Sequence, residues 1–541
     1  MKKTFLVLWL FAASLAVNAQ TWQDTLALIE KMAERYQPAA PGCQLAISRN
    51  GQVIFSRAWG MADLEHNVPL STASIIEAGS VSKQFTAAAI LLLEQQGKLS
   101  VNDDVRKYVP ELPDYGTPIL LRQMMQHTSG LKDWGSVMDI AGWPRSTKTY
   151  SNEDALLIIA RQKTLNHTPG AEYIYSNSNY NLFAVIVERV SGMSLAEFTR
   201  MYIFEPVGMK HTEWRNNFKK IVPNRAIAYE KSGSTYLTDM PNEYVYGNGG
   251  LLTTTEDLLK WNDYYLNGKF GNPSLLSKQL KTYPFNNGQM NPYGAGLAVN
   301  SVRGWKSIAH TGATAGYRAS LEYFPELGLS IAWLSNTSEF DGRPSLANDV
   351  RNLLVKNRTV ADKKSEPTPY NLTKEKLADY AGWYKDNRNG NGIQLSVRDG
   401  KLTNAAGENL LPVAENAFIW RGNRLEFHSG KPTRLSLITA QDTTSFVAVA
   451  DARSDEKVMA EYLGDYWSDE AEAKFSVRLK DGKLVLYRAP QSEFPLTPTY
   501  KDGFLAAPGI LHFERDKKGR VNILNISVSR ARNVAFKKIE M

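Results

Sequence analysis

Ser80 and Lys83 are spaced as a nucleophile and its activating amine would be. They stand three residues apart, just before an apolar run at 85–93. Such a run predicts a helix buried on every side, and residues three apart on a helix share one face. Burial disfavours the charged form of a lysine, whose ordinary pKa is ~10.4, and so favours a neutral amine that can accept a proton. The pair therefore predicts nucleophilic chemistry at Ser80.

Ser80 also lies where negative charge would be stabilised. The amides of the first turn of a helix have no partner within that helix, and the helix dipole favours negative charge at this end. The Ser80 N–H is therefore a candidate for one half of an oxyanion site.

The same Ser-x-x-Lys spacing occurs twice more, at Ser129/Lys132 and Ser454/Lys457. The first of these lies in a predicted turn and the second in a polar run, so neither begins a buried helix. Context favours Ser80 as the nucleophile. On this evidence alone an accidental match at Ser80 stays open.

Tyr-Ser-Asn also occurs twice, and its surroundings differ. Tyr150-Ser151-Asn152 comes directly before two acidic residues and an apolar helix, which predicts a helix N-cap. Tyr175-Ser176-Asn177 follows Pro169-Gly170 and an extended run, and we expect the next helix to begin several residues later, near Leu182. This second triplet is therefore predicted on a loop, where a tyrosine can relay a proton and an asparagine can hold a carbonyl.

A third group of interest is His310-Thr311-Gly312, which precedes strand-like runs at 321–324 and 329–334. The small residues Gly312 and Ala313 would let another part of the chain approach the backbone closely. The alternative interpretation is a glycine-rich turn between strands.

Other catalytic patterns are missing from the sequence. There is no Gly-x-Ser-x-Gly, no His-Glu-x-x-His, and the seven histidines are scattered. His127 is interpreted as structural, because it stands at the corner of a predicted turn. We expect no cofactor and no metal.

These residues need elements to position them, and the chain predicts several. We expect a helix at 22–36, a hairpin turning at Asn50-Gly51, and helices at 254–266 and 344–356.

The second part of the chain repeats itself. Tyr380 and Tyr462 begin similar stretches, as do Asp399 and Asp481, and both pairs are 82 residues apart. Each copy alternates apolar residues before an Asp-Gly turn, which predicts antiparallel strands. We expect two small β domains, closed as barrels because closure removes exposed edges.

The predicted organisation has five parts. Basic, apolar and small residues in order at 1–19 predict a signal peptide cleaved near Ala19, and 361–372 is a polar, proline-bearing linker. We expect the catalytic domain at 20–360 and the two β domains at 373–455 and 456–541. We expect a secreted or periplasmic protein, with no stable membrane insertion after cleavage.

Charge gives little indication of a partner. The formal net charge is +8, which includes Lys2 and Lys3, and the basic residues form no tract. We expect no nucleic acid partner, but a small-molecule or peptide substrate, with cell-wall material as one source. The oligomeric state is left open.

Taken in chain order, Ser80-Val81-Ser82-Lys83, Tyr175-Ser176-Asn177 and His310-Thr311-Gly312 resemble the penicillin-recognising serine hydrolases. The similar branch contains class C β-lactamases, D-Ala-D-Ala carboxypeptidases and D-aminopeptidases, and the two β domains resemble the accessory barrels of D-aminopeptidases. The resemblance covers about 22–356. It implies an α/β fold, with an antiparallel sheet flanked by helices and a helical subdomain, and a site between sheet and subdomain.

The resemblance also implies a role for each residue. Ser80 would be acylated, Lys83 would activate it, and Tyr175 would act as acid and base. Asn177, Thr311 and Gly312 would bind substrate, and the amides of Ser80 and Ala313 would form the oxyanion hole. Which of Lys83 and Tyr175 takes the first proton stays open.

The resemblance places His310 at the position where the β-lactamases have lysine. Carboxypeptidases and aminopeptidases of the branch also have histidine at this position. A histidine, mostly neutral near pH 7, gives up the permanent charge that favours a substrate carboxylate. The predicted function is hydrolysis of amide bonds in D-amino-acid peptides or amides. The alternatives are an esterase, a weak β-lactamase, or a non-catalytic cell-wall or peptide binder.

Overall fold

The computed structural model describes residues 22–266, 273–358, 368–430, 433–439, 442–453, 455–489 and 492–539. The predicted signal peptide, Ser454 and most of the predicted linker lie outside these residues. The contacts divide the chain into two compact units. The first unit comprises 1–95, 191–281 and 295–361, and the second unit comprises 96–190, 282–294 and 362–541. The domain boundaries expected from the sequence remain predictions.

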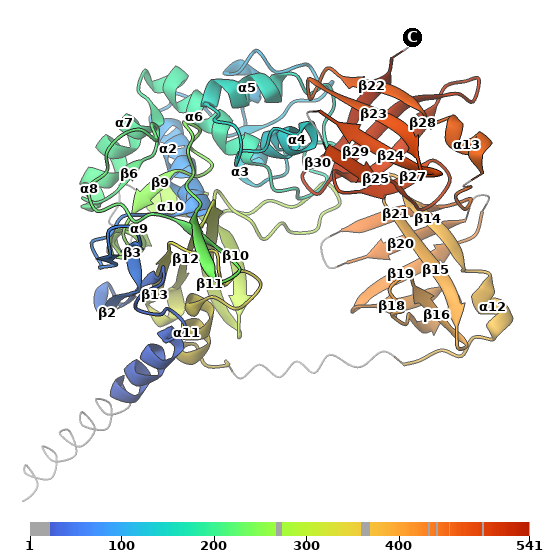
Figure 1. The fold of residues 1–541 in the computed structure, drawn as a ribbon. Coiled ribbons are helices and arrows are strands. Elements are labelled where there is room, and N and C mark those ends of the chain that lie inside the picture. Colours follow the sequence, from blue (N-terminus) through green and yellow to red (C-terminus); the bar gives the residue numbers. More distant parts are fainter. Residues whose placement is uncertain are drawn as a thin grey trace, which may run out of the picture. The chain divides into compact units, whose positions relative to one another are not determined.

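The first unit is built on a six-stranded antiparallel sheet of order β10-β11-β12-β13-β1-β2 (Figure 1). Its strands are β1 (Cys43–Arg49), β2 (Gln52–Trp59), β10 (Ala298–Val302), β11 (Trp305–Thr314), β12 (Tyr317–Phe324) and β13 (Leu329–Ser335). The predicted hairpin is confirmed, because Asn50 and Gly51 join β1 to β2 with φ of 52° and 79°. Two left-handed residues in a row are what the Asn-Gly pair favours in such a turn.

The residues around His310 form a strand, whereas the sequence left open a glycine-rich turn. β11 pairs along its length with β10 and β12, and His310 lies opposite Leu321. Residues 312 and 313 are both small, so the sequence does not show the alternation of buried and exposed side chains that β11 has in the structure.

Helices cover both faces of this sheet. The N-terminal helix covers 22–33, slightly less than predicted, and joins α11 (Leu346–Leu354) in one apolar core with the sheet. α9 (Thr255–Leu266) packs on β1 and β13. Trp261 of α9 donates from Nε1 to Gln84 Oε1 (2.7 Å) of α2 (Lys83–Gln95), a helix whose side chains are almost all buried.

The remaining elements of the first unit are short. They are the helices α7 (Leu195–Thr199), α8 (Glu205–Val207) and α10 (Pro273–Leu280), a π-helical turn (Arg200–Phe204), a 3-10 turn (Pro325–Leu327), and the strands β3 (Met61–Asp63), β4 (Val68–Pro69), β5 (Ile76–Glu77), β6 (Glu213–Trp214), β7 (Tyr229–Ser232), β8 (Thr235–Thr238) and β9 (Leu251–Thr253). β5, β9 and β6 form a small sheet of their own.

The second unit begins with a helical region. Its elements are a 3-10 turn (Val105–Lys107), α3 (Leu121–Met125), α4 (Trp134–Ala141), α5 (Asn152–Ala160) and α6 (Asn177–Ser191), whose last residue is assigned to the first unit. As predicted, Ser151 is the N-cap of α5 and accepts a hydrogen bond from Asp154 N. In the part of the chain that the structure describes, every helix is too short or too polar to cross a bilayer.

Two nearly closed antiparallel barrels complete the second unit (Figure 1). The first barrel contains α12 (Lys374–Ala378), β14 (Gly382–Asp386), β15 (Gly392–Arg398), β16 (Lys401–Asn404), β17 (Leu411–Ala414), β18 (Ala417–Trp420), β19 (Asn423–His428), β20 (Arg434–Ile438) and β21 (Thr443–Val449). The second barrel contains α13 (Glu456–Ala460), β22 (Gly464–Ser468), β23 (Ala473–Lys480), β24 (Lys483–Arg488), β25 (Ser492–Pro495), β26 (Thr497–Pro498), β27 (Gly503–Ala506), β28 (Gly509–Arg515), β29 (Val521–Val528) and β30 (Ala531–Lys538).

The repeat seen in the sequence is a repeat of structure. The helix and first strand of the two barrels begin 82 residues apart, at Lys374 and Glu456 and at Gly382 and Gly464. The two Asp-Gly turns also match, with φ of 49° and 52° at the aspartates. Aromatic and aliphatic side chains fill the first barrel, among them Tyr384, Phe418 and Phe427. The fold class predicted from the sequence, an antiparallel sheet with helices followed by two barrels, is confirmed.

Candidate active site

Ser80 lies in a single 3-10 turn, Gly79–Ser82, that leads directly into α2. The sequence predicted Ser80 at a helix entrance, and the structure places it one turn before the α-helix proper. Gly79 has a φ of +49°, which is the left-handed region that glycine enters without strain. This residue turns the chain sharply from β5 into the turn that carries Ser80.

Lys83 is fully buried, and its amine points at the serine. Lys83 Nζ donates to Ser80 Oγ at 3.0 Å and to the carbonyl oxygen of Asn248 at 2.6 Å. The three-residue spacing therefore does bring the two side chains together. A proton can pass between the hydroxyl and the amine along this contact.

The turn at 247–250 holds the start of α2 from one side. Thr86 Oγ1 donates to Gly247 O (2.7 Å), and Leu251 N donates to Ser82 Oγ (3.1 Å). Next to this turn, the buried guanidinium of Arg215 pairs with the Glu77 carboxylate (2.8 Å). The Lys83 acceptor at Asn248 is thus part of a turn that is hydrogen-bonded to α2.

Strand β11 packs against the Ser80 turn so closely that only glycine fits at two positions. A Cβ built on Gly79 would lie 2.8 Å from Ala313 N, and one built on Gly312 would lie 3.0 Å from Ser80 N and even closer to Ala78 O. The backbone amides of Ser80 and Ala313 therefore lie beside each other. This is the arrangement that an oxyanion hole made of two amides requires.

His310 is buried on β11 and held by its neighbour. Its Nδ1 donates to the carbonyl oxygen of Thr311 at 2.6 Å. Burial, together with the positive charge that Lys83 carries when protonated, lowers the pKa of His310 to about 4. The imidazole is therefore neutral near pH 7, while Thr311, the next residue, has its side chain exposed on the other face of the strand.

In the second unit, Tyr175 and Asn177 stand at the start of α6. The sequence predicted this helix to begin several residues later, but Asn177 is its first residue. The prediction failed because the first turn is polar: Ser178 Oγ donates to Lys132 O (2.7 Å), and Ser129 Oγ donates to Asn179 Oδ1 (2.7 Å). Buried polar groups paired in this way show no apolar periodicity.

Two residues that the sequence did not assign to the site position this triplet. His127, with a φ of 56°, accepts at Nδ1 from Ser176 N (3.1 Å) and lies with its ring 4.1 Å from that of Tyr175. Asp133 accepts at Oδ2 from Asn177 N at 2.7 Å. His127 is therefore structural, as predicted, but it acts on the candidate catalytic loop. The only sequence signal was its place before the predicted turn.

Asp63, Glu65 and His66 offer ligand atoms within 4.8 Å of one another. They lie in a surface turn where His66 Nδ1 contacts Asp63 Oδ2 at 2.8 Å. This contact satisfies the cluster without an ion, and we assign it no metal.

The chain is similar to known proteins of one family. The sequence model of the Beta-lactamase family matches residues 27–356. A penicillin-binding protein of Bacillus subtilis (strain 168) is 30% identical over 329 residues, which are 58% of this chain and 71% of that protein. A D-aminopeptidase of Cereibacter sphaeroides (strain KD131) is 30% identical over 299 residues, which are 55% of this chain and 57% of its own length.

A solved structure extends the likeness beyond these residues. The octameric penicillin-binding protein homologue from Pyrococcus abyssi matches with a TM-score of 0.53 and 22% identity, over 87% of this chain and 99% of that one. At this identity the match shows a shared fold.

Proposed function

We propose a function that follows from the family of this chain. The chain belongs to the Beta-lactamase family and is a serine hydrolase. The proposed reaction is hydrolysis of amide bonds in D-amino-acid peptides or amides through an acyl-enzyme on Ser80. The observation that carries the proposal is the contact of the fully buried Lys83 Nζ with Ser80 Oγ, 3.0 Å long.

The proposed first step is attack of Ser80 Oγ on the substrate carbonyl carbon. A bond forms between them, the hydroxyl proton passes to Lys83 or to Tyr175, and the carbonyl oxygen becomes an anion. The amides of Ser80 and Ala313 bind that oxygen; one such donor is worth about 2.7–4 kcal/mol in the transition state. The C–N bond then breaks, and the leaving nitrogen receives a proton from Tyr175.

In the second step, water hydrolyses the acyl-enzyme. Water loses a proton to Tyr175, which gave its own to the leaving nitrogen, and attacks the ester; the acid is released, and Ser80 recovers its proton from the residue that had accepted it. Dividing the acyl transfer in this way replaces one difficult step with two easier ones. Asn177 would hold the amide of the substrate on the acyl side, and Thr311 and Gly312 would line its path.

The D-amino-acid part of the proposal has support from the D-aminopeptidase relative, of which this chain spans little more than half. Secretion is proposed from the first 19 residues alone. N-terminal sequencing of the protein exported by a Gram-negative host tests it, and a mature chain that still begins at Met1 would contradict it.

The test of the function uses D-alanine and L-alanine p-nitroanilides with the wild-type protein and Ser80→Ala. We expect p-nitroaniline release from the D form that Ser80→Ala abolishes, with unchanged melting temperature as a control for folding. Full activity in Ser80→Ala would refute the proposal. Turnover of the matched p-nitrophenyl ester but of neither anilide would favour the esterase alternative.

A further inference from the structure

A buried ion pair lies directly before the Ser80 turn. Its members, Glu77 and Arg215, are 138 residues apart in the chain, and their side chains are 0% and 1% exposed. Arg215 Nε donates to Glu77 Oε2 at 2.8 Å, and Arg215 Nη2 donates to Glu77 Oε1 at 3.3 Å. The planar guanidinium therefore meets both oxygens of the carboxylate, a geometry that fixes direction as well as distance.

Arg215 also holds the turn that contacts Lys83. Its Nη1 donates to Glu243 O, and its backbone N donates to Gly250 O at 2.7 Å. These two acceptors lie on either side of Asn248 in the chain, and the Asn248 carbonyl oxygen accepts from Lys83 Nζ. One residue therefore holds both ends of the segment that carries the Lys83 acceptor.

Glu77 is the other end of this link, and only two residues separate it from Ser80. The backbone between them is held by few hydrogen bonds, one of them from Ala78 N to Leu251 O at 2.8 Å. The small sheet here is short, because β5 and β6 have two residues each and β9 has three. The ion pair therefore adds a side-chain link between the Ser80 turn and the segment that supports Lys83.

Stability alone gives no reason for a pair of this kind. Removing two charges from water costs free energy that their attraction offsets only in part, and apolar residues of similar volume are often at least as stable. A fork of hydrogen bonds, in contrast, fixes the geometry of the two segments that it joins.

We infer that the Glu77–Arg215 pair positions Ser80 against Lys83, an inference that rests on the proposed role of Ser80 as the nucleophile. Both members are positioning residues. Glu77 acts through the Ser80 turn, and Arg215 acts through the segment that offers the Asn248 carbonyl oxygen to Lys83. Together they hold Ser80 Oγ and Lys83 Nζ at the 3.0 Å that proton transfer needs.

The experiment separates positioning from stability with two variants. Arg215→Met leaves the buried Glu77 carboxylate without its cation, so both the melting temperature and kcat should fall. The double variant Glu77→Leu/Arg215→Met removes both charges, so its melting temperature should return toward that of the wild type. Its kcat on D-alanine p-nitroanilide should stay about 100-fold low with KM within about threefold, because a misplacement of about 1 Å acts on the chemical step.

A second readout does not depend on the substrate. A fluorophosphonate labels an activated serine, because Oγ forms a bond to phosphorus while fluoride leaves. We expect Ser80 labelling in the double variant to slow by about the same factor as kcat. This slowing, without turnover of any D-amino-acid amide by the wild type, would remove the proposed substrate and still support the positioning role. Neither labelling nor turnover in the wild type would overturn both.

The matched control is Arg35→Met in the same unit. Arg35 likewise joins a carboxylate, that of Asp349 in α11, to a backbone carbonyl oxygen, that of Pro344 (3.0 Å). This variant should melt at a lower temperature and keep wild-type kcat and labelling. Wild-type kcat in the double variant, or an equal loss of kcat in Arg35→Met, would overturn the inference.

Arg215→Lys decides the question if the double variant does not fold. A lysine keeps the positive charge but lacks the planar fork that spans the Glu77 carboxylate and Glu243 O. It should keep most of the stability and show a kcat on the order of tenfold below that of the wild type. Wild-type kcat in Arg215→Lys would overturn the inference.

Discussion

Gly312→Ala tests the close approach of β11 to the Ser80 turn. The added methyl carbon would lie 3.0 Å from Ser80 N and still closer to Ala78 O, both backbone atoms that cannot swing away. Gly312 has no left-handed φ, so the substitution strains packing and not the backbone. The strand must move outward, and the amides of Ser80 and Ala313 then separate.

Two magnitudes follow from this geometry. Overpacking of this kind costs about 1–3 kcal/mol of stability, which is a shift in melting temperature of about 2–4 °C for each kcal/mol. Loss of one aligned oxyanion donor lowers kcat by roughly 10²–10³. We therefore expect a folded variant, melting a few degrees lower, whose kcat on D-alanine p-nitroanilide falls about 100-fold or more.

Gly249→Ala is the matched control. A Cβ on Gly249 would have its nearest neighbours, Gly79 C and O, at 3.8 Å, which is ordinary contact. This variant should keep a near-wild-type kcat and melting temperature. The reasoning is refuted if Gly312→Ala keeps wild-type kcat, or if the two variants lose activity equally.

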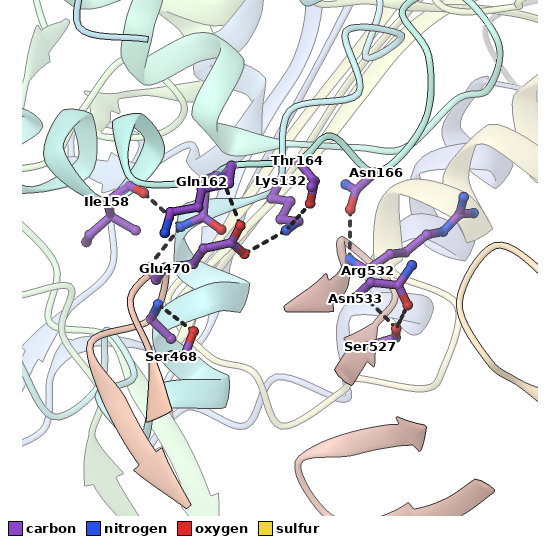
Figure 2. A network of polar contacts seen from close by, with 12 residues as sticks. Lys132, Ile158, Gln162, Thr164, Asn166, Ser468, Glu470, Ser527, Arg532 and Asn533 are labelled. Atoms are coloured by element: carbon purple, nitrogen blue, oxygen red, sulfur yellow. Dashed lines mark hydrogen bonds and ion pairs between the residues drawn. The ribbon is translucent and has the colours of Figure 1, made fainter. Parts of the chain in front are cut away.

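Three further predictions concern charge and support. His310 has a pKa of about 4 in the folded protein and an ordinary pKa near ~6.5 in the unfolded chain. Between these pH values the unfolded state binds more protons, so the free energy of unfolding should fall by about 3 kcal/mol as the pH drops from ~6.5 to ~4. His310→Asn should flatten that pH dependence in thermal melts. Glu470→Ala leaves the buried Lys132 amine without its carboxylate (Figure 2), so chemical denaturation should show a loss of about 3–5 kcal/mol in the free energy of unfolding. The control Asp469→Asn, at an exposed ion pair with Lys163, should be as stable as the wild type. Equal losses of stability in the two variants would contradict the role of the buried pair. Asp133→Ala removes the N-cap of α4 and the acceptor of Asn177 N, so it should cost about 1–2 kcal/mol and lower kcat, and an unchanged kcat would refute its positioning role.

Local features of the fold were predictable from the sequence because their causes are local. The Asn50-Gly51 turn, the buried helix after Ser80 and the 82-residue repeat each depend on residue types within one short stretch. The Ser80–Lys83 contact follows from spacing on one helical path.

What the sequence did not predict depends on distant partners. The first turn of α6 is polar because Ser178 and its neighbours bond to a loop some 46 residues earlier. Glu470 meets Lys132 across 338 residues, and the Arg530 carbonyl oxygen accepts from Asn166 Nδ2 across 364. Neither pairing leaves a periodic signal, since one ion pair or one hydrogen bond from a side chain changes no pattern along the chain.

The central claim is that Ser80 carries the acyl group. It is tested most directly by quenching the wild-type protein in acid during turnover of a D-alanine ester and mapping the adduct by mass spectrometry. We expect an added D-alanyl mass on the peptide that contains Ser80, absent in Ser80→Ala. An adduct on any other residue, or turnover in Ser80→Ala at the wild-type rate, would contradict the account.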